Sequence, residues 1–309
     1  LAAASTLPLV GVLFLPIAFG LFHIYEWTDE SHMAGDPILA HKQPYLNPTS
    51  FFLRAGVYWL IWLALLFFVR LTSRRVYPFG SEAARRVRVT SGLGLGLSGL
   101  AITFASFDLG MSLEPHWYST IYGVIFFVGQ GLAALAFTIV ALVYWPADEN
   151  AVVVAGPDDL HDLGKLLLAF TMFWAYVSFS QFLIIWYGNL PEEVVWYQRR
   201  FAHGWQWVAV AIAVFHFILP FLVLLGRDIK RHARPLAVVA LWMVVMRWVD
   251  TVWQIEPAFA REGPFVPWLD LVITAAIGGV WLLYFTWLIA PVAVPVSSPP
   301  RREEVLVHE

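Results

Sequence analysis

Two charged residues lie near the middle of an apolar segment that is long enough to cross a bilayer. The segment runs from Leu236 to Ile255, and Arg247 and Asp250 stand three residues apart within it. An Arg or Asp at the centre of a membrane helix costs roughly 2.5 to 3.5 kcal/mol, so both side chains are predicted to face protein or water and to have partners. Residues three apart share one helical face. The pair is therefore a candidate for a fixed electrostatic lock or for a proton relay.

A histidine in the preceding apolar segment is predicted to lie at a similar depth. His216 stands about 15 residues into the segment from Phe201 to Leu225, which is near the membrane centre at a rise of about 1.5 Å per residue. The connection between the two segments is short, so they are predicted to be antiparallel neighbours. His216 is then expected to face Arg247 or Asp250. The alternative is an ordinary core histidine with a hydrogen bond.

A polar stretch opens another apolar segment and supplies candidates for proton uptake. It reads DDLHDLGKLLLAF, and Asp162 is the candidate for the first proton-binding group. The alternative is a helix N-terminus whose carboxylates cap the helix and complement its dipole. Hydroxyl and amide groups farther along are candidates for holding water, although such groups in membrane helices commonly serve packing. The candidates of this segment are His161, Asp162, Lys165, Tyr176, Ser180 and Gln181.

A third polar cluster lies between two other apolar segments, in the sequence ASFDLGMSLEPHWYSTIYG. It contains Asp108, Glu114 and His116. Carboxylate and imidazole groups are suited to accepting protons from an oxidised quinol or to releasing them from the membrane. The alternative is a solvated turn in which Pro115 fixes the start of the next helix.

The composition is that of a polytopic membrane protein. Hydrophobic residues make up 60% of the chain and charged residues only 13%. A membrane helix needs about 20 apolar residues, and only helices of this length satisfy their backbone groups within one segment. The sequence therefore predicts an all-α fold with at least eight transmembrane helices. The predicted spans are Leu7 to Tyr25, Phe51 to Val69, Val89 to Phe107, Trp117 to Tyr144, Leu163 to Tyr187, Phe201 to Leu225, Leu236 to Ile255 and Leu269 to Ala290.

The distribution of cations predicts the orientation of these spans. Arginine and lysine are concentrated in the connections at residues 70–88 and 226–235 and near the C-terminus, and the positive-inside rule places these regions in the cytoplasm. Both ends of the chain are then cytoplasmic. The acidic connection at 146–162 is assigned to the same side by alternation. The connections predicted to face outward are 28–48, 108–116, 188–200 and 256–267.

The predicted domain organisation is a transmembrane domain over residues 1–290 and an extended, Pro-rich cytoplasmic tail over 291–309. Leu1 is not an initiator methionine, so further helices are expected to precede it. The chain contains no cysteine, which excludes thiolate-held iron–sulfur clusters and c-type haem attachment within it. A two-haem cytochrome b is disfavoured because His216 has no intramembrane histidine partner on another predicted helix. No metal site is predicted.

Four stretches resemble one family of membrane subunits. They are SFDLGMSLEPHWYSTIYG from Ser106, HDLGKLLLAFTMFWAYVSFSQFLIIWYGNLPEE from His161, FHFILPFLVLLGRDIKR from Phe215, and WLDL from Trp268. These stretches are similar to the second of the two large membrane subunits of alternative complex III, a bacterial quinol:cytochrome c oxidoreductase. Such subunits belong to the NrfD-like family, the polysulfide reductase type of membrane anchor. The resemblance covers most of the chain.

The resemblance implies two four-helix bundles with flanking helices in a bacterial cytoplasmic membrane. It implies a role in quinol oxidation, with a proton route through this chain and without a covalently bound cofactor of its own. Quinone or quinol is the candidate ligand, while haem c and iron–sulfur clusters are expected on partner subunits. The expected partners are a second NrfD-like membrane subunit, an iron–sulfur subunit, haem c subunits, in some assemblies a terminal oxidase, and lipids, but not nucleic acid.

Two other functions stay open at this point. A structural anchor for redox subunits on the outer side would use the same helices without moving protons. A secondary transporter would also bury charges, but such proteins often contain paired broken helices at the midplane, and the sequence shows no convincing pair.

Overall fold

The computed structural model describes residues 2–73, 81–144, 156–260, 263–264 and 268–289. Within these ranges every regular element is a helix or a helical turn. Eight helical segments are long and apolar enough to cross a membrane, which confirms the predicted all-α, multi-pass fold. The tail at 291–309 and the part of the acidic connection at 145–155 lie outside the described residues.

The eight spans match the predicted segments in number and order. The spanning helices are α2 (Leu7–Ile24), α5 (Pro48–Ser73), α6 (Glu82–Leu109), α7 (Thr120–Tyr144), α8 (Pro157–Gly188), α13 (Ala233–Ile255) and α14 (Trp268–Ile289), while the sixth span is built from α10 (Trp205–Ile212), the π-helical turn η3 (Ala213–Ile218) and α11 (Leu219–Leu225). The shorter elements are α1 (Ala2–Ser5), η1 (Glu26–Thr28), α3 (Glu30–Gly35), α4 (Pro37–Lys42), η2 (Met111–Leu113), α9 (Pro191–Arg200), α12 (Arg227–Arg231) and η4 (Glu256–Ala258).

Several helices begin well before their apolar stretch because a polar cap sets the helix end. The α8 helix begins at Pro157, a residue favoured at the first helical position, and the Asp159 carboxylate accepts a hydrogen bond from the Gly156 N–H at 3.0 Å. In α6, the Ser81 hydroxyl accepts a hydrogen bond from the Ala84 N–H at 3.1 Å. The capping interpretation of the polar stretch before the fifth span is therefore confirmed for Asp159.

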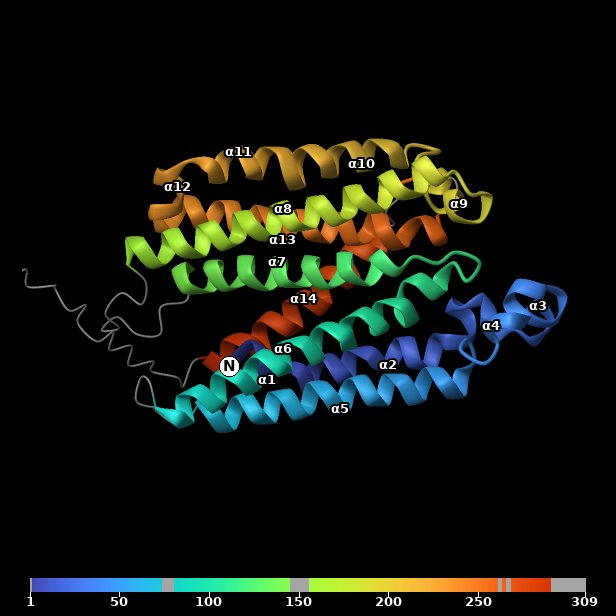
Figure 1. Cartoon of the computed structure of the whole chain (residues 1–309), viewed down its shortest axis with the longest axis horizontal. Coiled ribbons are helices and arrows are strands. Elements are labelled where there is room, and N and C mark those ends of the chain that lie inside the picture. The colour runs from blue at the N-terminus through green and yellow to red at the C-terminus, as the bar shows by residue number, and fades with distance from the viewer. Residues whose placement is uncertain (1, 74–80, 145–155, 261–262, 265–267, 290–309) are drawn as a thin grey trace, which may run out of the picture.

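The helices α7, α8, α13 and the α10–η3–α11 span form a four-helix bundle, which we call the C-terminal bundle (Figure 1). One continuous apolar core joins all four. Its α7 residues, such as Leu132 and Ile139, pack with Leu167 of α8, Leu224 of α11 and Met243 of α13. Each of these five side chains is buried completely, so the bundle has a single interior in which a polar side chain must find a partner.

The remaining spanning helices, α2, α5, α6 and α14, form a second layer beside the C-terminal bundle (Figure 1). The two layers meet where α6 packs on α7, and a Cβ atom at Gly123 would overlap Thr103 of α6. The α14 helix crosses this layer obliquely, and its Trp281 and Phe285 rings pack against Phe137 of α7.

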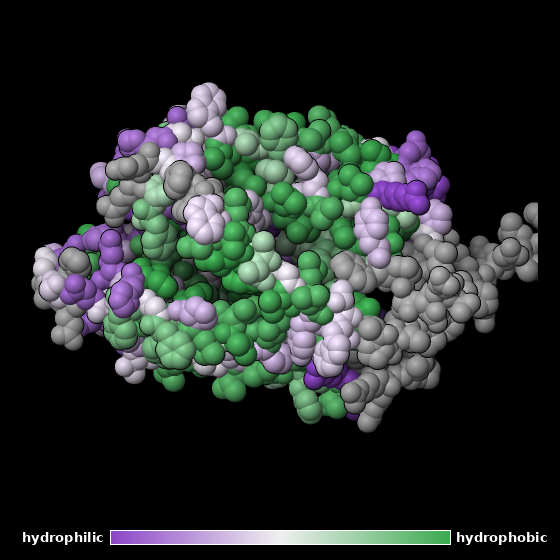
Figure 2. Space-filling model, turned by 180° about the vertical axis from the view of Figure 1, so that it is seen from behind, coloured by the Kyte–Doolittle hydropathy of each residue, from purple (hydrophilic) through white to green (hydrophobic). Residues whose placement is uncertain are grey.

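The two ends of the molecule differ in the elements that they carry. The α3, α4 and α9 helices lie at one end, which we call the α9 end, and α12 lies at the other, the α12 end (Figure 1). The four connections predicted to face one side meet at the α9 end, where His116 contacts Asp36, Arg199 contacts Glu114 and Trp205 contacts Ala260. Figure 2 shows hydrophobic side chains over the middle of the rear face and hydrophilic ones gathered toward its ends, as expected of a membrane-spanning protein.

Candidate functional site

The charged pair of α13 faces the interior of the C-terminal bundle. Arg247 is 3% exposed and Asp250 is 2% exposed. A guanidinium nitrogen of Arg247, Nη1, donates a hydrogen bond to Oδ2 of Asp250, and the guanidinium also lies 5.5 Å from the centre of the Phe126 ring. The prediction that the two residues share a protein-facing side and have partners is confirmed. Removing one member of such a buried pair costs about 3 to 5 kcal/mol because the other charge is left uncompensated.

A glycine on α7 provides the space for the arginine. A Cβ atom at Gly129 would lie 2.6 Å from Nε of Arg247, closer than side-chain atoms approach one another. Nε and Nη2 of Arg247 have no hydrogen-bond partner among the described residues, so the guanidinium is held mainly by Asp250 and by close packing. Gly129 carries no signal in the sequence, because its role depends on which face of α7 meets α13.

A tryptophan on α8 links the charged pair to the histidine of the sixth span. The Trp174 Nε1–H donates to Oδ2 of Asp250 at 3.1 Å, and the Trp174 ring packs edge-on against the His216 ring with 4.3 Å between centroids. His216 is completely buried, and neither of its ring nitrogens has a hydrogen-bond partner among the described residues. His216 therefore makes no direct hydrogen bond to Arg247 or Asp250, and Trp174 contacts both its ring and the Asp250 carboxylate.

The backbone around His216 is π-helical rather than α-helical. The Leu219 N–H bonds to the Val214 carbonyl, one residue farther back than in an α-helix. Pro220 accounts for this, since its ring would clash with the His216 carbonyl in an α-helical arrangement. Pro220 also has no N–H to offer the Phe215 carbonyl, and the Trp242 Nε1–H of α13 fills that place at 2.8 Å. Helices in membranes tolerate proline where a neighbouring helix supplies the missing donor in this way.

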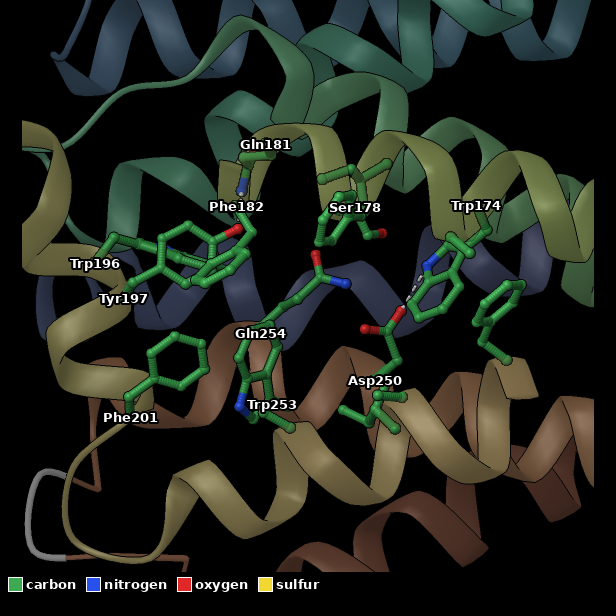
Figure 3. Close-up of a pocket in the computed structure, with 17 residues that line it drawn as sticks. Trp174, Ser178, Gln181, Phe182, Trp196, Tyr197, Phe201, Asp250, Trp253 and Gln254 are labelled. Carbon is green, nitrogen blue, oxygen red and sulfur yellow. Dashed lines mark hydrogen bonds between the residues drawn. The ribbon is translucent and has the colours of Figure 1, made fainter. Parts of the chain in front are cut away.

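A cavity of about 310 Å³ opens beside Asp250, between α8, α9, α10, η3 and α13. Figure 3 shows Asp250 and Trp174 at one end of it and the Trp196, Tyr197 and Phe201 rings at the other. Its wall is mainly aromatic and aliphatic. Phe179, one of the lining residues, is 61% exposed on the outside of the bundle, so the cavity reaches the surface that lipid covers.

Four polar side chains lie in the wall of this cavity between its two ends. Ser178 Oγ, Trp253 Nε1 and Gln254 Oε1 are buried and have no hydrogen-bond partner among the described residues. Gln181 is bonded on both sides, since it accepts from the Ser119 hydroxyl at 3.0 Å and donates to the Tyr197 hydroxyl at 3.4 Å. Burial raises the pKa of Tyr197, so its hydroxyl stays protonated. Unpaired polar atoms facing an open space are where bound water or a polar ligand group is expected.

The three candidates at the α6–α7 connection each have a separate ionic partner rather than a common site. Asp108 is 2% exposed and pairs with Arg54 at 2.9 Å and with the Tyr58 hydroxyl at 2.8 Å. Glu114 is 7% exposed and pairs with arginines of α9. The solvated-turn interpretation is therefore wrong for these two carboxylates. His116 is half exposed, as that interpretation requires, and bonds to the Asp36 carboxylate at 2.6 Å, but the next helix begins at Thr120 and not at Pro115.

The candidates at the start of α8 lie on the surface of the α12 end. Asp162 and Lys165 form an exposed ion pair at 3.1 Å, and His161 is partly exposed beside them. Between this ion pair and Asp250 the bundle is filled by apolar core residues, among them Leu167, Leu236 and Met243. Toward the α9 end, Asp250 is followed by a polar column, which consists of Ser178, Gln254, Gln181 and Tyr197. Toward the α12 end, the apolar core residues Leu167, Leu236 and Met243 form an apolar plug.

Two further candidates of α8 point away from the polar column. Tyr176 is 69% exposed on the outer surface of the bundle, and Ser180 is partly exposed and does not line the cavity. The sequence predicts a polar role for both and for Gln181, but only Gln181 faces inward. The helical period explains this, because residues 176 and 180 lie on a different face of α8 from 174, 178 and 181.

Comparison with known proteins adds no relative. No protein-family model matches the chain, and no curated protein matches it either.

Proposed function

We propose that this chain is a membrane subunit of a respiratory quinol oxidoreductase of the alternative complex III type, located in a bacterial cytoplasmic membrane. In this proposal the chain contributes part of a proton route, and the iron–sulfur and haem c centres belong to partner subunits. The observation that carries it is the buried Arg247–Asp250 pair, bonded to Trp174 and placed at the end of a cavity with polar atoms in its wall. A buried ionisable residue inside a membrane span is a functional candidate by default.

The geometry supports proton exchange between Asp250 and the α9 end. Water held by Ser178, Gln254 and Gln181 would connect the Asp250 carboxylate with Tyr197, which stands at the outer limit of the cavity. Proton uptake at Asp162 and Lys165 would require water or a helix movement across the apolar plug. Arg247 then stabilises the negative charge that Asp250 carries after it releases a proton.

The cavity is also suited to a quinone-like head group. Its volume of about 310 Å³ is in the range of small-molecule sites, which bind mostly through apolar and aromatic walls with a few placed polar groups. The flat Trp174, Phe182 and Trp196 rings offer stacking surfaces, and the opening beside Phe179 would admit an isoprenoid tail from the lipid. A quinone ring bound there would lie next to Asp250. Reduction or oxidation of the ring would then be coupled to proton transfer with this carboxylate.

A structural anchor is the second candidate, and the α9 end supplies the observation that favours it. Two buried ion-pair groups, Arg54 with Asp108 and Arg199 with Glu114, tie the connections of that end to one another and to the helices beneath. Such ties would make a firm platform for a redox subunit. A secondary transporter is less favoured, because η3 is the one interrupted transmembrane helix in the described part of the chain, and transporters often have a pair.

The Asp250→Asn variant separates these functions. We expect the assembled complex carrying it to oxidise quinol in proteoliposomes while proton translocation is lost, because the amide cannot take up and release a proton. Asp228→Asn, which removes an exposed carboxylate on α12, is the matched control and should leave both activities unchanged. Full proton translocation with Asp250→Asn would contradict the proton role. Loss of assembly would favour the anchor if it also occurs when both charges are removed together, in Arg247→Gln with Asp250→Asn, because no buried charge is then left uncompensated.

The proposed partners have their own test. The chain is purified from its native membrane under mild conditions, and the copurifying proteins are examined for c-type haem by absorbance and for iron–sulfur clusters by electron paramagnetic resonance. Both signals are expected. Purification of the chain with neither signal would contradict its assignment to such a complex.

A further inference from the structure

The short helix α9 forms the outer wall of the cavity. Its Trp196 and Tyr197 side chains are 3% and 7% exposed, and both line the cavity together with Phe201, which follows the helix (Figure 3). Other residues of α9, among them Glu192 and Gln198, are exposed. This amphipathic helix therefore separates the cavity from water at the α9 end.

Backbone geometry at both ends of α9 is suited to a hinge. Asn189, at the end of α8, has φ 45°, and after α9 the chain passes through His203 with φ 52° and Gly204 with φ 98°. These left-handed conformations interrupt the helical path on either side of α9 and isolate it from α8 and α10. Hinges are commonly a few residues at element ends that absorb a change of φ and ψ.

The inner face of α9 borders a second open space besides the cavity. A second cleft of about 360 Å³ lies between α9 and the end of α8, with Trp186 and Val194 in its wall. It shares Phe182, Tyr197 and Phe201 with the main cavity, so open space borders the inner face of α9 on both sides. A helix bordered in this way has open space to move into, and its opening would separate the Trp196 ring from Trp117.

One buried carboxylate fixes the charged end of α9, beside the aromatic contact in which Trp196 stacks on Trp117 at 4.9 Å. Glu114 of the α6–α7 connection accepts a hydrogen bond from Arg199 at 2.8 Å and forms an ion pair with Arg200 at 2.8 Å. Arg200 is 1% exposed, and its guanidinium stacks on the Trp196 ring at 3.6 Å. The Trp117 indole N–H adds a bond to the Glu193 carbonyl at 3.1 Å. The carboxylate that neutralises Arg200 thus also fixes the ring that closes the cavity.

We propose that α9 is a hinged lid over the cavity and that Glu114 is the positioning residue that holds this lid closed. Without the Glu114 charge, Arg200 would be an uncompensated buried cation, and lifting α9 would return it to water. The lid would thus control access of water and protons to the polar column from the α9 end, while the opening beside Phe179 admits apolar molecules from the lipid. The use of the cavity rests on the function proposed above, but the lid movement does not.

The chain has no cysteine, so a single introduced thiol can report access to the cavity. Ser178→Cys places a thiol of similar size in the cavity wall. The full-length chain is placed in lipid nanodiscs, and the rate of modification by a water-soluble maleimide is followed by mass spectrometry. We expect slow modification with Glu114 present and a rate roughly ten- to a hundredfold higher with Glu114→Gln, since loss of a buried ion pair strongly destabilises the closed position.

Three controls separate lid opening from general loosening. A lipid-soluble maleimide should modify Ser178→Cys at the same rate with or without Glu114→Gln. A thiol at Ala136, in the fully buried core of α7, should stay unmodified in both backgrounds. Asp36→Asn, which breaks the His116 ion pair at the same end without touching α9, should not change the rate.

Two results would overturn the lid. The first is an unchanged water-soluble modification rate in a folded Glu114→Gln protein. The second result comes from Arg199→Gln, which is used if Glu114→Gln does not fold. This variant removes the more exposed partner of Glu114, so it should also raise the rate of modification by the water-soluble maleimide, by a smaller factor. No increase with Arg199→Gln would contradict the lid. None of these measurements depends on quinol oxidation or proton transfer.

Discussion

At the scale of single residues, the buried pair depends on neighbours that carry no charge. Arg247 is stable in the bundle only because Asp250 compensates its charge and Gly129 leaves room for its guanidinium. Trp174 then satisfies the same carboxylate oxygen from α8. The site is therefore a packing arrangement around one ion pair, and a change of a single methyl group is expected to affect it.

The Gly129→Ala variant tests this dependence. The added methyl group would force Arg247 to move away from Asp250, so we expect a loss of about 1 to 3 kcal/mol in the free energy of unfolding, as for other overpacked cores. The measurement is an SDS unfolding titration of the purified chain. Gly96→Ala on α6 is the matched control, because a Cβ there meets nothing within 4 Å and alanine favours the helix. Equal stability of the two variants would contradict the role of Gly129.

Only some residues of the site could be predicted from the sequence. The spacing of Arg247 and Asp250, together with the cost of burying charge, was enough to predict that they share a protein-facing side. Gly129 and Trp174 could not be predicted, because their contacts depend on how α7 and α8 are rotated about their axes. The same uncertainty of rotation explains why Tyr176 was nominated although it points outward.

At the scale of elements, the hydropathy pattern predicted the apolar part of each helix but not its ends or its irregularities. Helix α6 begins at Glu82 rather than Val89 because its N-cap is the polar Ser81. Helix α9 was missed because it is short and amphipathic and lies in a polar connection. The π-helical turn had one signal in the sequence, Pro220 inside an apolar span, whose steric demand on the preceding turn is known.

The Trp242→Phe variant tests how the π-helical turn is maintained. Removing the indole N–H leaves the Phe215 carbonyl without its donor in an apolar environment, where water cannot replace it. Hydrogen bonds between membrane helices average about 0.6 kcal/mol and reach about 1.7 kcal/mol, so the free energy of unfolding should fall by an amount in this range. Trp207→Phe, which changes an indole that is 70% exposed on α10, is the control. A smaller loss for Trp242→Phe than for Trp207→Phe would rule out this support of η3.

At the scale of the whole molecule, the two ends differ in whether their cations are exposed or paired with buried carboxylates. At the α12 end, Arg85 and Arg86 are exposed on α6, and Arg227 is exposed on α12. At the α9 end, Arg54, Arg199 and Arg200 are engaged by buried carboxylates. The positive-inside rule therefore favours the α12 end in the cytoplasm, which would direct the proposed lid and the polar column outward.

This orientation can be measured with introduced thiols, because the chain has no cysteine of its own. Gln198→Cys places a thiol on the exposed face of α9, and Asp228→Cys places one on α12. In intact cells, a membrane-impermeant maleimide should modify the first and not the second, whereas both should react after the membrane is permeabilised. The reverse pattern would place α9 in the cytoplasm. The polar column would then connect Asp250 to the cytoplasm, and the proposed route would take up protons at the end where it is now expected to release them.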